Sequence, residues 1–426
     1  MSRAKSSLLL LTSLSLALML PMSPGPVEAT KSKRCEGTKK QRKQKMELRD
    51  LTDEQLEGLI ERYKTIVSAD REQIAQTVLR RLEREYQEHQ SSGEPWVYDV
   101  LVISGGGAKG AFGAGFLEGW GALPAGPTTR PEFDVVTGVS TGALIAPFAF
   151  AGTDEAYAEV ADFYAEPEPN WAHKRGELAL LPHHASLFND CHLQDMIRKK
   201  IDPALVSAVA QGAAEDRLLL IGATNLDAGR GRPFNLGEEA KAALESGSFD
   251  RVQSILLASS AIPGIFPPVE IDQMLYGDGG ATSNLFLITF SGTEGPLAQF
   301  RQRHPEAPVP KTRIWVVVNE ALVPQPAVTQ PRWLSVSGRA LDTLTKTGEL
   351  FALRLIQAIV YEFRTDRGVD AEVRIVSIPQ EAPQPETTEM FDKEYMIKLE
   401  DMGREMGADP SVWRTEVPSA YSFDRD

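Results

Sequence analysis

The sequence predicts an α/β protein built around a mainly parallel β-sheet that helices cover on both faces. The first observation is a series of short, strongly apolar segments, which we expect to be strands: residues 97–103, 133–137, 218–222, 314–318 and 373–378. The second is that helical stretches lie between them, such as residues 111–120, 142–150, 193–200 and 341–362. Strands that alternate with helices are typical of parallel sheets buried on both faces.

The N-terminus has the pattern of a secretory signal peptide, predicted at residues 1–29. Arg3 and Lys5 give it a basic start, and the Leu- and Ala-rich stretch that follows is too short to span a bilayer comfortably. Prolines then break the helix, and Val27 and Ala29 place small residues before a cleavage point. We therefore expect an exported protein, periplasmic or secreted and peripheral to a membrane. The alternative is an anchor formed by an uncleaved N-terminal segment.

Two further segments precede the main domain, which is predicted at residues 96–426. Residues 30–50 are rich in Lys and Arg, which favours a solvated linker, and contact with anionic lipid is the alternative. Residues 51–95 are expected to be helical because apolar residues recur at helical spacing. Thr52 and Gln55 match a capping box at the start of this segment. It is either one long helix or a hairpin broken near residues 68–70.

The composition restricts the function classes. Hydrophobic residues make up 42% of the chain and charged residues 24%, which is ordinary for a globular protein. The net charge of −14 argues against nucleic-acid binding. The chain has only two cysteines, and no metal-ligand spacing is present, so we predict no metal. No pattern in the sequence specifies an oligomeric state.

The first chemical motif is a G-x-S-x-G sequence centred on Ser140. Its glycines are Gly138 and Gly142, and it stands between an expected strand and an expected helix. In this context the turn is so sharp that bulky neighbours would collide, and the serine is exposed at the helix N-terminus. The N–H of Thr141 and the helix dipole then face any oxyanion that forms. We interpret Ser140 as a nucleophile.

The second motif is the glycine loop that follows the first expected strand. It contains Gly105, Gly106, Gly107, Lys109 and Gly110. Consecutive glycines let backbone N–H groups point into a site with no side chain in the way. Either a phosphate or the oxyanion of an acyl intermediate suits such a loop. Because the acidic residue of a dinucleotide site is missing and a serine turn is present, we favour an oxyanion hole formed by Gly105, Gly106, Gly107 and Thr141.

A serine nucleophile needs a proton acceptor, and two candidates exist. His304 is the only histidine that follows both Ser140 and Asp278, as the chain order of a Ser–His–Asp hydrolase requires, but its neighbours resemble an exposed charged loop. Asp278 lies before Gly279 and Gly280, a neighbourhood that by itself is typical of a turn. The residues alone leave the dyad and the triad open.

The motifs together resemble the patatin-like phospholipase family. Five stretches carry the resemblance in the same order: residues 105–110, 138–142, 223–230, 258–269 and 278–280. They span a core of residues 101–284, outside the N-terminal segments. The resemblance implies a three-layer α/β/α sandwich and a dyad in which Asp278 is the base for Ser140. Asp-Gly-Gly stands here where many members of the family have Asp-Gly-Ala.

The resemblance implies two-step acyl transfer on a lipid or phospholipid at a membrane surface. Ser140 attacks the ester, the glycine loop holds the oxyanion, and water activated by Asp278 releases the fatty acid. The implied mechanism needs no metal and no cofactor. Burial must raise the pKa of Asp278 for this chemistry to work at neutral pH. Two alternatives remain: a Ser–His–Asp esterase that uses His304, and a non-catalytic lipid- or partner-binding module on the same fold.

Overall fold

The computed structural model describes residues 51–165, 173–174, 186, 188–290, 295–323, 326–387 and 389–418. The predicted signal peptide and basic linker therefore lie outside the described residues.

The central sheet has eight strands and is mainly parallel, as predicted. Its main path runs in the order β10-β9-β1-β2-β5-β8-β7, and β6 also pairs with β5. The parallel strands are β1 (Val97–Ile103), β2 (Val135–Val139), β5 (Leu218–Asn225), β9 (Lys311–Val318) and β10 (Ala371–Ser377). The strands β6 (Arg230–Asn235), β7 (Val269–Ile271) and β8 (Met274–Asp278) add antiparallel pairs.

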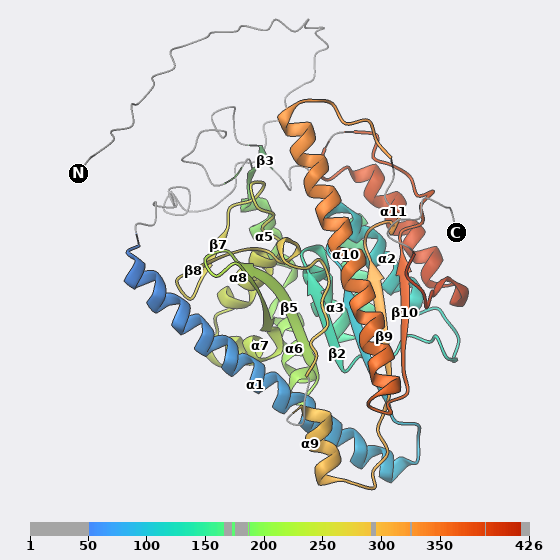
Figure 1. The fold of residues 1–426 in the computed structure, drawn as a ribbon. Coiled ribbons are helices and arrows are strands. Elements are labelled where there is room, and N and C mark those ends of the chain that lie inside the picture. Colours follow the sequence, from blue (N-terminus) through green and yellow to red (C-terminus); the bar gives the residue numbers. More distant parts are fainter. Residues whose placement is uncertain are drawn as a thin grey trace, which may run out of the picture. The chain divides into compact units, whose positions relative to one another are not determined.

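Helices cover both faces of the sheet and give the expected three layers (Figure 1). Alternate residues of β1 point to opposite faces, so that Leu101 and Ile103 join one core and Val100 and Val102 the other. The first core is closed by α2 (Gly110–Trp120), α3 (Thr141–Ala151), α4 (Asp154–Ala165), α5 (Cys191–Lys200), α6 (Pro203–Ala214), α7 (Leu236–Ser246), α8 (Asp250–Ser259) and α11 (Lys393–Gly407). The second is closed by α1 (Asp53–Ser92), α9 (Pro296–Arg303) and α10 (Trp333–Thr365).

Short elements complete the described chain. A two-stranded ribbon pairs β3 (His173–Lys174) with β4 (Phe188–Asn189). Single 3-10 turns lie at Gly107–Lys109, Gly279–Ala281 and Pro410–Val412. None of the described helices is both long and apolar enough to cross a membrane.

The N-terminal helical segment is one continuous helix, α1, rather than a hairpin. Thr52 and Gln55 form the predicted capping box, and Gly93 ends the helix in the left-handed conformation. Arg81 of α1 pairs with the buried Asp134 at 2.7 Å, at the edge of the sheet where β2 begins. These contacts fix α1 across the face of the sheet.

The predicted strand boundaries shift where tertiary contacts decide them. The strand expected at residues 133–137 is β2, which begins two residues later and runs to Val139. Asp134 lies before it because its carboxylate accepts a hydrogen bond from the N–H of Asp99 at 2.7 Å. At its other end, β2 stops at Val139, directly before Ser140.

Candidate active site

Ser140 occupies a strained turn between β2 and α3. Its backbone has φ 54° and ψ −122°, in the positive-φ region that side chains rarely adopt. The N–H of Ser140 donates to Ser259 Oγ at 3.0 Å, and the Ser259 hydroxyl donates to the carbonyl of Gly222 at 2.6 Å. Ser260 Oγ donates to the carbonyl of Ser140 at 3.3 Å. Two buried serines that follow one another at the end of α8 thus hold both backbone polar groups of Ser140.

The glycines around Ser140 are required by close packing. A Cβ atom on Gly142 would collide with the carbonyl oxygens of Ile103 and Ser104, and one on Gly138 would collide with the backbone of Gly142. The start of α3 therefore lies directly against the end of β1. This contact brings the serine turn beside the glycine loop, which begins one residue after Ser104.

Asp278 is the last residue of β8, not part of an isolated turn. In the sheet, Asp278 pairs with Ala223 of β5, while the neighbouring Gly222 pairs with Val139 of β2. Ser140 and Asp278 therefore stand at the same level on the two sides of β5. Neighbouring strands are separated by about 4.8 Å, so their backbones lie roughly 10 Å apart and their side chains can meet above the strand between them.

The carboxyl group of Asp278 is buried and only partly satisfied. Its Oδ1 accepts a hydrogen bond from the N–H of Gly280 at 2.7 Å, while the buried Oδ2 has no partner of ordinary hydrogen-bond geometry among the described residues. Burial raises the pKa of Asp278 to about 6, although the Ser140 hydroxyl and the Gly280 N–H act in the opposite direction as hydrogen-bond donors. Asp278 is thus a stronger base than an exposed carboxylate, with the Ser140 hydroxyl beside it.

The glycine loop presents free backbone donors at the same edge. The N–H groups of Gly106 and Gly107 donate to none of the described residues, and Gly107, at φ 58°, faces open space. Thr141 is the first residue of α3, so its N–H has no acceptor within that helix. Gly105 differs, because its N–H donates to the carbonyl of Asn284 at 3.0 Å. Gly105 therefore supports the loop, and the free donors are those of Gly106, Gly107 and Thr141.

Polar side chains behind the loop hold its backbone. Asn319, which follows β9, donates from its N–H to Ser104 Oγ and from Nδ2 to the Ser104 carbonyl, both at 2.8 Å. Its Oδ1 accepts the N–H of Gly113 in α2 at 3.0 Å. The Ser104 hydroxyl in turn donates to the carbonyl of Gly105 at 2.8 Å. Asn319 therefore ties the loop to both β9 and α2.

A buried carboxyl group from α10 extends this network. Asn284 Nδ2 donates to Glu349 Oε1 at 3.0 Å and lies 3.5 Å from the carbonyl oxygen of Gly105. Glu349 is only 2% exposed. Burial, and then the charge of Glu320, raise its pKa to about 8 against the opposing contacts of Asn284, Ser104 and Lys109. Glu349 is therefore mainly protonated at pH 7, and it contacts the Asn284 amide beside Gly105.

The positive charge of Lys109 in the glycine loop is already compensated by a carboxylate. Lys109 forms an ion pair with Glu320, which follows Asn319 at the end of β9. Lys346 of α10 approaches the same carboxylate at 3.6 Å and Asp342 at 3.5 Å. Lys109 thus fastens the loop to β9 and α10 rather than carrying an unpaired charge.

His304 lies far from the serine turn in the fold. It ends α9, where its ring packs against Tyr86 and Phe300 with centroid separations of 5.2 and 5.0 Å. Phe300 also packs on Trp96, which directly precedes β1. His304 is therefore near the beginning of the parallel strands, whereas Ser140 follows the end of one. The triad alternative lacks the contact it requires.

Several residues of the site were not singled out from the sequence. Asn319 follows an apolar strand at its carboxyl end, a position that favours functional residues in parallel sheets. Glu349 shares its helix face with the buried Leu353 and Ile356, and an acidic residue on an apolar face is a usable signal. No cluster of metal-ligand type exists among the described residues.

A serine on a strand-to-helix turn, a buried carboxyl group and a glycine loop meet at one sheet edge. This combination is the arrangement of α/β proteins that use serine as a nucleophile. A sequence model of the patatin-like phospholipase family matches residues 101–290. This stretch contains the five motifs, and Asn319 and Glu349 lie outside it.

No curated protein matches the chain. Among solved structures, the chain is similar to VipD from Legionella pneumophila at 11% identity, with 76% of this chain and 68% of that chain covered and a TM-score of 0.33.

Proposed function

We propose that this protein is a serine hydrolase of lipid acyl esters that uses Ser140 and Asp278 as a dyad. The observation that carries the proposal is the position of the Ser140 hydroxyl beside a buried carboxyl group whose pKa is raised to about 6. A carboxylate with that pKa is largely ionised at pH 7 and accepts a proton more readily than an exposed aspartate. The family match over residues 101–290 supports lipid as the substrate class.

The reaction follows from the groups at the sheet edge. Asp278 removes the proton of the Ser140 hydroxyl as its oxygen attacks the ester carbonyl. The N–H groups of Gly106, Gly107 and Thr141 stabilise the negative charge that develops on the carbonyl oxygen. The alcohol or lysolipid leaves with the proton held by Asp278. Water then attacks the acyl-enzyme, with Asp278 again as the base, and the fatty acid is released.

The predicted export of the chain agrees with this activity. A signal peptide at residues 1–29 and the basic segment at 30–50 would bring the enzyme to the outer side of a membrane, where lipids are the accessible esters. We propose a periplasmic or secreted enzyme that acts at a membrane surface.

Lipid profiling tests the substrate class. Protein that begins at Thr30 is incubated with mixed phospholipid and triacylglycerol vesicles, and the released fatty acids and lysolipids are quantified by mass spectrometry. We expect release by the wild-type protein and none by Ser140→Ala. A non-catalytic binding module would instead bind the vesicles and release nothing.

The histidine alternative has a separate test. We expect His304→Ala to keep kcat for a p-nitrophenyl acyl ester within about threefold of the wild-type value, because the ring packs at the other end of the parallel strands. A loss of about a thousandfold or more, as for a missing triad base, would replace the dyad with a triad.

The raised pKa of Glu349 leads us to expect that kcat falls at alkaline pH. Because the pKa of Glu349 is raised to about 8, it ionises as the pH rises above 8 and places a second negative charge next to Glu320, behind the glycine loop. That charge opposes the oxyanion, so kcat should fall above about pH 8. Glu349→Gln keeps a neutral partner for Asn284 and should remove this limb with little change at pH 7.

A second variant, Glu349→Ala, tests whether the contact with Asn284 positions the glycine loop. Glu349→Ala removes the closer of the two acceptors of the Asn284 amide, and we expect kcat to fall about tenfold at every pH while KM changes little. Full pH profiles of both variants are the measurement. An alkaline limb that persists in Glu349→Gln would show that another group titrates there.

A further inference from the structure

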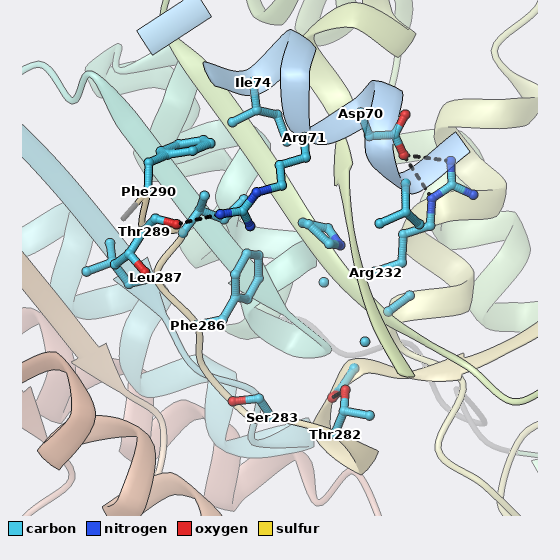
Figure 2. A pocket seen from close by; sticks show the side chains of 17 residues that line it. Asp70, Arg71, Ile74, Arg232, Thr282, Ser283, Phe286, Leu287, Thr289 and Phe290 are labelled. Carbon is cyan, nitrogen blue, oxygen red and sulfur yellow. Dashed lines mark hydrogen bonds and ion pairs between the residues drawn. The ribbon is translucent and has the colours of Figure 1, made fainter. Parts of the chain in front are cut away.

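The face of the sheet covered by α1 and α10 is incompletely packed. A cavity of about 420 Å³ lies between α1, strands β5 and β6, and the segment at residues 279–290 (Figure 2). A second cavity of about 560 Å³ lies beside it, between α1, α9, α10 and the sheet. Both are lined by Ile74 of α1 and by residues 287–290. Concave spaces of this size hold small-molecule ligands.

The second cavity is apolar along its length. Its floor is made of alternate residues of neighbouring strands, whose side chains point toward this face, and α1, α9 and α10 supply its walls. The apolar lining includes Val78, Leu82, Val100, Leu220, Ile314 and Phe363. This cavity crosses four neighbouring strands, β5, β2, β1 and β9, a width of roughly 14 Å. Such a long apolar space fits an extended hydrocarbon chain.

One end of this cavity carries a positive charge that has no anionic partner among the residues that the structure describes. Arg301 of α9 lines the cavity, and its guanidinium donates only to the carbonyl of Arg367, at 2.6 Å, among the described residues. Of the other charged groups at this end, Arg367 pairs with Glu362 at 2.7 Å, and the exposed Asp366 accepts the hydroxyl of Thr365 at 2.7 Å without an ion pair among the described residues. An arginine in this situation favours a carboxylate ligand.

We propose that the cavity beneath α1 binds a long-chain fatty acid, with its hydrocarbon chain along the sheet and its carboxylate at Arg301. The cavity is separate from the Ser140–Asp278 site, although its neighbour reaches Gly279, the residue after Asp278. The choice of a fatty acid agrees with the product of the proposed reaction, and in that respect the inference rests on the proposed function. The binding itself requires no catalysis.

Fluorescence titration with cis-parinaric acid tests this site in the Ser140→Ala protein, so that turnover plays no part. We expect saturable binding that the methyl ester of the same acid competes for at least about tenfold less well, because the ester has no charge for Arg301. Arg301→Gln should weaken binding of the acid by about tenfold and leave that of the methyl ester unchanged. Arg303→Gln is the matched control, since Arg303 is in the same helix and pairs with Glu83.

A second variant fills the cavity from α9. Ala298→Trp should abolish binding of both the acid and its ester, while circular dichroism checks that the fold is kept. Binding that neither Arg301→Gln nor Ala298→Trp weakens would overturn the proposal. Equal affinity for acid and ester, unchanged by Arg301→Gln, would overturn the placement of the carboxylate. Catalysis by the wild-type protein without any fatty-acid binding would refute this site and leave the proposed function intact.

Discussion

Replacing Ser140 with alanine is expected to lower kcat for acyl-ester hydrolysis by about 10⁴- to 10⁶-fold, because the acyl-enzyme can no longer form. The backbone contacts of residue 140 with Ser259 and Ser260 do not involve its hydroxyl, so the turn should persist. The residual rate over water would come from binding and from the N–H donors of Gly106, Gly107 and Thr141.

Steady-state kinetics on a p-nitrophenyl acyl ester measure this effect, with thermal unfolding as the check on the fold. Ser246→Ala is a matched control, because Ser246 is exposed on α7 and its hydroxyl bonds only within that region. Activity that survives in Ser140→Ala would mean that a different residue is the nucleophile.

Replacing Asp278 with asparagine is expected to lower kcat by about 10³- to 10⁴-fold and, at the same time, to stabilise the fold. The loss of activity follows because an amide cannot accept the proton of Ser140. The gain in stability follows because the folded protein must bury an ionised carboxyl group whose Oδ2 has no partner of ordinary geometry among the described residues. Asparagine removes that charge at nearly the same volume.

The pKa of Asp278 determines the pH range over which stability and kcat change. The group titrates near 3.8 when exposed and near 6 in the fold, so the folded state binds more protons than the unfolded state between these values. Wild-type stability therefore falls as the pH rises from about 4 to 6, and the advantage of Asp278→Asn grows to at most about 3 kcal/mol above pH 6. Over the same range kcat of the wild-type protein should rise, because Asp278 becomes ionised.

Denaturant unfolding at pH 4 and pH 7 checks the stability of Asp278→Asn, with Asp250→Asn as the exposed control. If Asp278→Asn and the wild-type protein have the same free energy of unfolding at pH 7, the ionised Asp278 carboxylate does not destabilise the fold. An acid limb of kcat that remains in Asp278→Asn would assign that limb to another group.

The serine turn and the glycine loop could be predicted from the sequence because their signals are local. Each consists of glycines between an apolar strand and a helical run, and residues 97–103 match β1 to the residue. Strand β2 ends at Val139, two residues later than predicted, because Gly138 weakens the strand pattern. There the contact of α3 with β1 decides the boundary.

Asp278 shows the limit of local patterns. Gly277 and Gly279 on either side predict a turn, yet Asp278 ends a strand because Ala223 of β5 pairs with it. The role of Asp278 could be expected only from the lack of a suitable histidine and from the family resemblance. Its raised pKa depends on burial by elements that are distant in sequence.

The hydrogen bonds that link Glu349, Asn284 and the glycine loop could not be predicted from the spacing of residues in the sequence. Glu349 reaches the glycine loop through Asn284, and the three groups come from α10, the segment after β8 and the segment after β1. Only the crossing of α10 over the sheet brings them together. The continuity of α1 was likewise undecided, because the periodicity of residues 51–90 fits both a single helix and a hairpin.

The most direct test of the account is the site and rate of covalent labelling by a fluorophosphonate, which reacts with activated serine nucleophiles. Wild-type and Asp278→Asn proteins are labelled at pH 7, and the modified peptide is identified by mass spectrometry. We expect a single adduct on Ser140, formed at least about 100-fold more slowly in Asp278→Asn. An adduct on another residue, or labelling of Ser140 at an equal rate in both proteins, would contradict the proposed dyad.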